Sequence, residues 1–298
     1  MRLGESLKQA ERRLRAARLH YGHGTDNARD EAAFLVLRGL GLAFDADPAL
    51  VLKGSQVRRI ESLIRERVEK RIPAAYLLHE AWLDGHAFYI DRRVIVPRSH
   101  IAGLLAARLH PWLRRAPQRV LDLCTGSGCL AVLAALAFPR ARVDAADISR
   151  SALAVAKRNV ACYKLERRLR IVSSDLFGAL KKERYDLIVA NPPYVATRAL
   201  RSLPPEYRYE PGVALAGGGS GLDFVARILG DASRYLRSGG ILVCEVGDGR
   251  RAVERTFPRL PLLWPREEIF IAARAALFSR ASRAASLPAR STRARGHR

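Results

Sequence analysis

The spacing between apolar residues changes twice along the chain. Over residues 1–80, apolar side chains recur every three or four positions, which predicts amphipathic helices; one such set is Ile60, Leu63, Ile64 and Val68. A first helix is expected to end near His20 and a second to begin at a cap formed by Thr25 or Asp26. Pro73 would end the third helix. We therefore expect residues 1–80 to form a small helical domain.

Residues 81–97 change to the two-residue period of β-strands. Ala87–Ile90 and Arg93–Val96 are predicted as the two strands of a short hairpin, with Asp91-Arg92 between them. Pro97 closes the hairpin, because proline cannot donate to a strand ladder. This segment is expected to link the helical domain to the rest of the chain.

From about residue 98, apolar runs alternate with helical patterns. This alternation is typical of a doubly wound parallel sheet, so we expect an α/β domain over residues 98–278. The expected strands are 119–124, 142–147, 169–173, 185–190 and 240–246, and the expected helices are 130–137, 152–161 and 222–236. Residues 279–298 lack apolar periodicity, which predicts a basic, disordered tail.

Composition narrows the class of protein. Apolar residues make up 49% of the 298 residues, which is enough for a sizeable core and excludes a disordered or collagen-like chain. The net charge of +23 indicates a surface that attracts phosphate. Arginine supplies 45 of the 52 basic residues, so codon composition is an alternative explanation of the charge.

Several classes of location and ligand are disfavoured by the same sequence. No apolar run approaches the 18 residues of a membrane span, and the first residues carry too many charges for a secretory signal. The four cysteines have neither Cys-x-x-Cys spacing nor histidines at zinc-site distances. We expect a cytoplasmic protein with free thiols, no metal and no membrane partner, present as a monomer or dimer.

A glycine-rich loop follows the first expected strand of the sheet. The run Asp122-Leu-Cys-Thr125-Gly126-Ser-Gly128 leads from an apolar strand into an apolar helix. Its N–H groups and the helix N-terminus suit a dinucleotide phosphate, and equally the carboxylate of a methionine-derived cofactor. Because the pattern is G-x-G-x-x-A, a plain tight turn also stays open.

Two acidic residues end neighbouring strands of the same expected sheet. Asp147 lies 21 residues after Gly126, where a carboxylate can accept both ribose hydroxyls of an adenosine-bearing cofactor. It also precedes a helix, so it could serve as an N-cap. Asp175 follows a third strand, where it could accept the adenine amino group.

Asn191-Pro192-Pro193-Tyr194 directly follows the strand 185–190. Two prolines turn the chain rigidly at the edge of the sheet where ligands bind. An asparagine carbonyl and a prolyl carbonyl can each accept an N–H of a planar nitrogen, and the aromatic ring can pack against the flat group. Such positioning makes the nitrogen lone pair available for methyl transfer.

The chain resembles the HemK-like glutamine N5-methyltransferases, and within them the PrmB branch, which modifies large-subunit ribosomal protein L-three. The resemblance runs from about residue 21 to residue 264. It rests on the following stretches: Tyr21–Asn27, Pro73–Leu77, Val96–Ser99, Asp122–Cys129, Ser174–Phe177, Asn191–Val195, Leu203–Tyr207, Glu210-Pro211, Gly221–Asp223 and Glu245–Gly247.

The resemblance implies a Rossmann-like class I S-adenosylmethionine-dependent methyltransferase, with a seven-stranded sheet whose last strands form an antiparallel hairpin. S-adenosylmethionine would be the donor and S-adenosylhomocysteine the product. It implies that Asn191 to Tyr194 hold the glutamine amide and that residues 1–80 recognise the substrate. The cofactor would be bound by Asp122, Thr125, Gly126, Gly128, Asp147, Asp175, Leu176 and Asn191.

Three positions depart from the family pattern. The usual Pro-Arg-Ser-Pro-Ile-x-Glu continues here as His100–Gly103, Ser220 replaces an aspartate, and Trp264–Phe270 is short and charged. These departures leave open a ribosome-assembly factor that only binds. A nucleic-acid adenine N6-methyltransferase is a further alternative, because the same tetrapeptide serves that chemistry, and so is a release-factor glutamine methyltransferase. Because the acceptor would itself be basic, we expect the enzyme to meet it on ribosomal RNA in an assembling large subunit.

Overall fold

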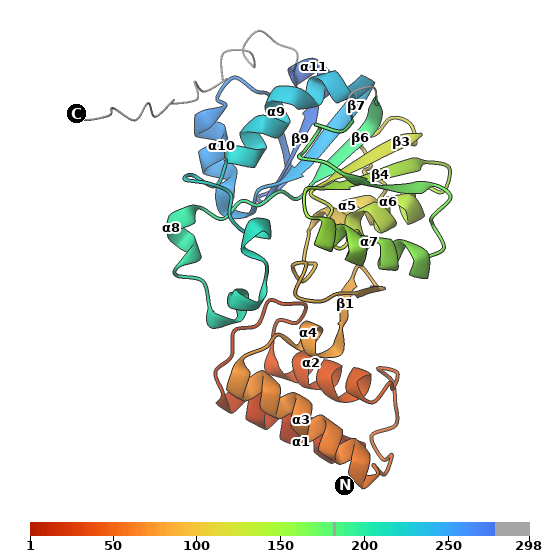
Figure 1. Ribbon diagram of the computed structural model, residues 1–298, viewed down its shortest axis with the longest axis vertical. Helices are drawn as coiled ribbons and strands as arrows, with labels where there is room; N and C mark the ends of the chain where they lie inside the picture. The colour runs from red at the N-terminus through yellow and green to blue at the C-terminus, as the bar shows by residue number, and fades with distance from the viewer. Residues whose placement is uncertain (181–182, 278–298) are drawn as a thin grey trace, which may run out of the picture.

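The computed structural model describes residues 1–180 and 183–277. Four helices at the N-terminus pack together below a larger α/β unit (Figure 1). They are α1 (Leu3–Ala16), α2 (Ala28–Ala33, continued by a π-helical turn over Phe34–Arg38), α3 (Gly54–Lys70) and α4 (Ala74–Leu78). No helix in the described residues is long and apolar enough to cross a membrane.

The helical prediction is confirmed in outline and corrected at three ends. The first helix ends at Ala16 rather than near His20. Asn27 caps α2 by accepting a hydrogen bond from the Asp30 N–H at 3.0 Å, so neither Thr25 nor Asp26 is the cap. The third helix ends before Arg71, whose φ of 59° leaves the helical region two residues ahead of Pro73.

The predicted hairpin exists, but its strands and turn were placed wrongly. The strands are β1 (Glu80–Leu83) and β2 (His86–Tyr89), and residues 93–96 form no strand. The turn is Asp84-Gly85, where both φ angles are positive, at 51° and 76°. That geometry is the hairpin turn that Asp-Gly favours, and its twist matches that of the two strands.

The α/β unit contains a seven-stranded sheet in the order β5-β4-β3-β6-β7-β9-β8. Strands β3 to β7 are parallel, whereas β9 pairs antiparallel with β7 and β8, as the resemblance implied. The strands are β3 (Arg119–Leu123), β4 (Arg142–Asp147), β5 (Leu169–Ser173), β6 (Tyr185–Ala190), β7 (Leu236–Glu245), β8 (Leu263–Arg266) and β9 (Ile269–Ala273).

Helices cover both faces of the sheet (Figure 1). One face packs on α5 (Ile101–Ala106), α6 (Cys129–Ala137) and α7 (Arg150–Cys162), and the other packs on α9 (Asp223–Tyr235), α10 (Arg250–Thr256) and α11 (Arg274–Leu277). Alternate residues of β3 divide between the two faces: Val120 belongs to one core, and Leu121 and Leu123 to the other. The predicted α/β fold is therefore confirmed, and the predicted tail lies outside the described residues.

The segment between β6 and α9 leaves the sheet and meets the N-terminal helices (Figure 1). It contains α8 (Thr197–Leu200) and short 3-10 turns over Pro205–Tyr209 and Gly212–Ala214. Its buried Glu206 accepts the His20 N–H at 3.1 Å and pairs with Arg71 at 3.0 Å and Arg67 at 3.4 Å. Arg67 is itself buried and donates to Glu31 at 2.7 Å. This buried ionic cluster holds the helical domain against the segment that follows β6.

Candidate active site

The two motifs that the sequence singled out meet at one edge of the sheet. Strands β3 and β6 pair in parallel, with Leu123 opposite Ala190. The glycine-rich loop and the Asn191–Tyr194 turn therefore leave from adjacent strand ends. The chain order of the strands reverses at this point, which is where open α/β sheets bind their ligands.

Backbone conformation shapes the glycine-rich loop. Cys124, Gly126 and Gly128 all have positive φ, at 58°, 55° and 79°. A Cβ at Gly126 would meet nothing within 4 Å, so open space faces this residue. A Cβ at Gly128 would lie 3.1 Å from the Cβ of Ala156, so this glycine lets the loop approach α7.

Asp122 supplies a buried carboxylate beneath this loop. Its Oδ2 accepts a hydrogen bond from the Thr125 hydroxyl, whereas its buried Oδ1 has no hydrogen-bond partner within the described part of the chain. Burial raises the pKa of Asp122 to about 7, against the lowering effects of the Thr125 hydrogen bond and of the Ala131 N–H in the first turn of α6. A buried acceptor that lacks a partner fits the ammonium group of a methionine-derived cofactor.

Asp147 ties the end of β4 to the glycine-rich loop. Its Oδ2 accepts the Gly126 N–H and its Oδ1 accepts the Ser149 N–H, both at 2.8 Å. Ser149 is the N-cap of α7, so the alternative that Asp147 caps this helix is wrong. Burial raises the pKa of Asp147, while these backbone hydrogen bonds lower it. Each carboxylate oxygen keeps a lone pair for a ribose hydroxyl.

Asp175 and Leu176 lie further along the same edge, after β5. The exposed Asp175 carboxylate pairs with Arg227 of α9 at 2.7 Å. Leu176 is buried and has a φ of 46°, which turns the chain sharply away from the strand. Their contact with adenine stays a prediction.

The Asn191–Tyr194 turn is supported from behind by glycines. A Cβ at Gly217 would lie 2.7 Å from the Pro193 carbonyl oxygen, and one at Gly221 would lie 2.4 Å from the Tyr194 carbonyl oxygen. Both proline rings are buried. The half-buried Asn191 side chain makes no hydrogen bond to any residue of 1–180 or 183–277, so its amide is available to a ligand.

Tyr194 packs across the ends of β6 and β7. A Cβ at Gly247 would lie 2.6 Å from Cε2 of the Tyr194 ring, so the ring rests on the backbone that follows β7. Burial, and then the nearby Glu245 carboxylate, raise the pKa of Tyr194 to about 12. The phenol therefore stays neutral at physiological pH and serves as an aromatic surface and hydrogen-bonding group.

Comparison with known proteins agrees with this geometry. Residues 102–203 match the methyltransferase small domain. Ribosomal protein uL3 glutamine methyltransferase of Bordetella pertussis is 54% identical over 267 residues, covering 88% of this chain and 90% of that protein. Its namesake in Burkholderia pseudomallei is 48% identical, covering 87% and 88%. This chain belongs to the uL3 glutamine methyltransferase family.

Solved structures show a more distant likeness. The hMettl16 catalytic domain, in complex with the MAT2A 3'UTR hairpin 1, is 18% identical, with a TM-score of 0.47. The match covers 76% of this chain and 81% of that one.

Family membership makes the chain a protein methyltransferase that uses S-adenosylmethionine. The orphan oxygen of Asp122 and the open space at Gly126 fit this donor. No group of His, Cys, Asp or Glu in the described ranges has the arrangement of a metal site. The absence of a metal stays a prediction.

Glu245 also belongs to the site. The sequence indicates it only as part of the family pattern. Its buried carboxylate, at the end of β7, accepts a hydrogen bond from the Ser99 hydroxyl, whose oxygen in turn accepts the Ile101 N–H at 3.2 Å. Burial raises the pKa of Glu245, and the Ser99 hydrogen bond opposes that rise. The chain at Ser99, which leads from the β1–β2 hairpin into α5, is therefore held beside Tyr194.

A second set of contacts joins residues 96–98 to the segment between β6 and α9. Arg98 donates to both carboxylate oxygens of Glu210, at 2.6 and 2.7 Å, and its guanidinium lies 5.3 Å from the ring centroid of Tyr207. The buried Glu210 also accepts the Val96 N–H at 3.0 Å. The only signal of these contacts in the sequence was the family pattern, because 112 residues separate Arg98 from Glu210.

The departures from the family pattern lie in three regions of the structure. Gly103 replaces the usual glutamate on an exposed position of α5, where a Cβ would meet nothing within 4 Å. Ser220 is also exposed. The charged stretch over 264–270 still forms the β8–β9 hairpin, with Trp264 packed edge-on against Phe270. Ser99 keeps its hydrogen bond to Glu245.

Proposed function

We propose that this chain transfers a methyl group from S-adenosylmethionine to the side-chain amide nitrogen of a glutamine in ribosomal protein uL3. The observation that carries the proposal is the pairing of β3 with β6, which sets the free Asn191 amide beside the cofactor loop. The substrate is inferred from the names of the relatives.

The residues of the turn would position the glutamine amide for attack. The Asn191 carbonyl would accept one amide N–H. The Pro192 carbonyl is the candidate for the other, because Gly217 backs the Pro193 carbonyl. Tyr194 would pack against the flat amide. With both hydrogens held, the nitrogen lone pair points at the methyl group.

S-adenosylmethionine, when bound, supplies an electrophilic methyl group on a sulfonium. Asp122 would hold its ammonium group and Asp147 its ribose hydroxyls, while Asp175 and Leu176 would flank the adenine. The amide nitrogen gains the carbon, the electron pair of the broken bond stays on sulfur, and the amide proton then leaves to water. Transfer needs no strong base, because the nitrogen loses its proton only after it has become cationic.

The test is methylation of purified uL3 with labelled donor, followed by peptide mass spectrometry. We expect one glutamine to gain a methyl group, and Asn191→Ala to lower kcat by about a hundredfold or more, because a preorganised acceptor is lost. Label confined to RNA, DNA or a release factor would overturn the proposal, as would unchanged kcat in the variant. Arg198→Ala, an exposed residue of α8, is the matched control.

We further propose that the enzyme acts in the cytoplasm on uL3 already bound to ribosomal RNA. The net charge of the sequence is +13 over residues 96–278 and +6 over 279–298, which favours contact with RNA. Residues 1–80 would recognise the protein substrate, with 81–97 as the link to the catalytic residues 98–278. A monomer or dimer suffices for this arrangement.

Salt dependence tests the RNA contact. Methylation of uL3 on RNA-bound particles should weaken steeply as salt rises from about 50 to 200 mM, because each neutralised phosphate releases counterions. Free uL3 serves as the control. Faster methylation of the free protein, with little salt effect on the particle, would return the positive charge to codon composition.

A further inference from the structure

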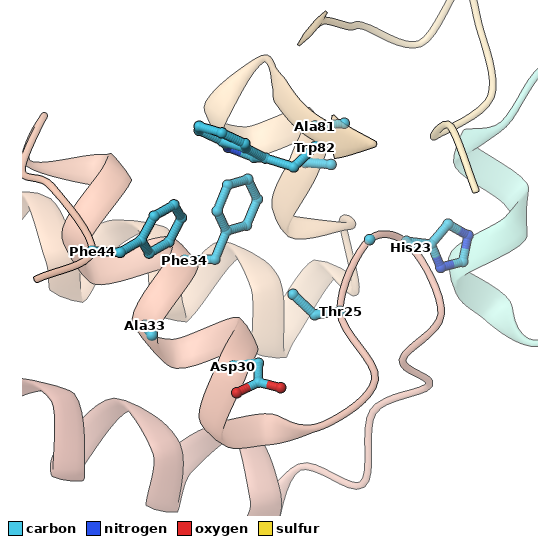
Figure 2. A pocket seen from close by; sticks show the side chains of 10 residues that line it. His23, Thr25, Asp30, Ala33, Phe34, Phe44, Ala81 and Trp82 are labelled. Atoms are coloured by element: carbon cyan, nitrogen blue, oxygen red, sulfur yellow. The ribbon is translucent and has the colours of Figure 1, made fainter. Parts of the chain in front are cut away.

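A cavity of about 280 Å³ lies in the helical domain, apart from the strand edge of the active site. Its apolar wall includes Phe34 of the π-helical turn, Phe44 of the following loop and Trp82 of β1. Thr25 and Asp30 supply polar groups (Figure 2).

Two rings of this wall face solvent. Phe44 is 54% exposed and Trp82 is 37% exposed, and their rings pack edge to face at 5.7 Å. Among the large hydrophobic side chains that are exposed in the described structure, these two are the aromatic ones. Exposed aromatic rings beside a cavity are typical of an interface, because burying them against a partner gains free energy.

The segment that supplies most of the cavity wall is acidic, unlike the whole chain. Residues 21–52 contain five acidic and two basic residues in a protein of net charge +23, and of these acids Glu31 is paired with Arg67. Asp30 makes no ion pair within the described part of the chain; its hydrogen bonds are with Asn27. Arg38, beside Trp82, is neutralised by Glu80 at 2.7 Å. The cavity therefore has the Asp30 carboxylate, which makes no ion pair in the described structure, at one end and the exposed aromatic rings at the other (Figure 2).

We propose that this cavity docks a segment of the protein substrate in which an apolar side chain is flanked by lysine or arginine. The proposal rests on the proposed function, which gives the enzyme a ribosomal protein as substrate. Proteins that bind RNA are rich in positive charge, so the basic surface of this enzyme repels them. An acidic, aromatic cavity overcomes that repulsion locally, and it disfavours RNA as the occupant.

Packed side chains link the cavity to the Arg98–Glu210 ion pair. His23 and Gly24 form part of its wall. The buried His23 ring packs edge-on against the Tyr207 ring, with a centroid distance of 4.6 Å. The Arg98 guanidinium lies over the same Tyr207 ring. Burial, and then Arg98, lower the pKa of His23 to about 3, so this ring is uncharged at physiological pH. A substrate segment docked in this cavity therefore lies against the segment between β6 and α9, which begins with the Asn191–Tyr194 turn.

The test compares the variant Phe44→Ala/Asp30→Lys with Leu263→Ala/Glu166→Lys. The control makes the same changes at an exposed apolar residue of β8 and at an exposed acid after α7. We expect KM for uL3 to rise about tenfold or more in the cavity variant only, as for a hot-spot residue. The kcat at saturating uL3 and KM for S-adenosylmethionine should stay within about twofold, since the active site is untouched.

A second measurement does not depend on the stability of that variant. A photoreactive benzoylphenylalanine at position 44 of the otherwise unchanged enzyme should cross-link to a basic segment of purified uL3, and one at position 263 should not. Cross-links to RNA or to a second enzyme molecule alone, or an unchanged KM in the cavity variant, would overturn the cavity proposal. Failure of the unsubstituted enzyme to methylate uL3 would instead overturn the proposed function.

Discussion

At the scale of single residues, the site depends on buried acids whose protonation is set by their surroundings. Asp122, Asp147 and Glu245 all have raised pKa values because burial disfavours the charged carboxylate. Asp147 and Glu245 are bonded to N–H or O–H donors through the fold itself. Asp122 alone among the three has a buried oxygen without a partner in the described structure, so it has the most to gain from a cationic ligand.

We predict that cofactor affinity falls as the pH drops below about 7. Asp122 has a pKa of about 7 in the ligand-free protein, and a bound ammonium favours its ionised form. Binding at lower pH must therefore release a proton, which weakens affinity about tenfold between pH 8 and pH 6. Isothermal titration with S-adenosylmethionine measures this change.

Asp122→Asn is the control for that measurement. The variant should bind more weakly at pH 8 and lose the extra pH dependence, while any titration of the ligand itself is common to both proteins. Equal pH dependence in the two proteins would assign the effect to another group and would contradict the role of Asp122.

At the scale of elements, the sequence predicted the helices and strands that have a local apolar period or that end at a local turn signal. The central strands β3 and β6 are buried on both faces, so they appear as apolar runs. The predicted strands 142–147, 169–173 and 185–190 match the structure residue for residue. The hairpin differs from the prediction because the chain turns at Asp84-Gly85, a hairpin signal that the sequence contains, and not at Asp91-Arg92.

The contacts that complete the site had no such local signal. Ser99 and Glu245 are 146 residues apart, and neither belongs to a periodic pattern that pairs them. The positions of the Asn191–Tyr194 turn and the glycine-rich loop could be predicted because parallel strands end at one edge. The residues that hold those motifs from outside the sheet could not, since tertiary packing alone brings them together.

Gly247 tests how the end of β7 supports the acceptor turn. We predict that Gly247→Ala lowers kcat, because its Cβ would lie 2.6 Å from the Tyr194 ring and displace it. The positive φ of 51° also costs about 1–2 kcal/mol of stability. Steady-state kinetics with uL3 and denaturant unfolding measure the two effects separately.

Gly239→Ala is the matched control, with a φ of 76° and nothing within 4 Å of its Cβ. It should lose similar stability and keep its kcat. If Gly247→Ala also keeps kcat, contact with Gly247 does not position the Tyr194 ring.

At the scale of the whole molecule, buried ion pairs join the N-terminal helical domain to the segment that follows β6. Arg67 belongs to the helical domain and contacts Glu31 of that domain, the His20 carbonyl and Glu206 of the segment after β6. The helical domain is therefore oriented relative to the active site by a buried cation between two buried carboxylates. This arrangement explains how a docking cavity in one unit can serve an acceptor turn in the other.

Removing that cation should be costly, and the cost should depend on pH. We predict that Arg67→Met lowers the free energy of unfolding by about 3–5 kcal/mol at pH 7, because the buried Glu31 loses its only ion-pair partner in the described structure and the buried Glu206 keeps only Arg71. Arg65→Met, exposed on the same helix, should change it by less than about 0.5 kcal/mol. Burial already raises the pKa of Glu31, and loss of Arg67 removes the charge that opposes that rise.

The folded pKa of Glu31 in the variant then lies further above its unfolded value, so the protonated carboxyl is favoured in the folded state. Stability gained this way is present at low pH and is lost as the pH rises through the folded pKa. The difference between Arg67→Met and the unsubstituted protein should accordingly be largest near pH 7 and shrink toward pH 5. Urea unfolding at several pH values measures it, and a pH-independent difference would show that shape rather than buried charge joins the two units.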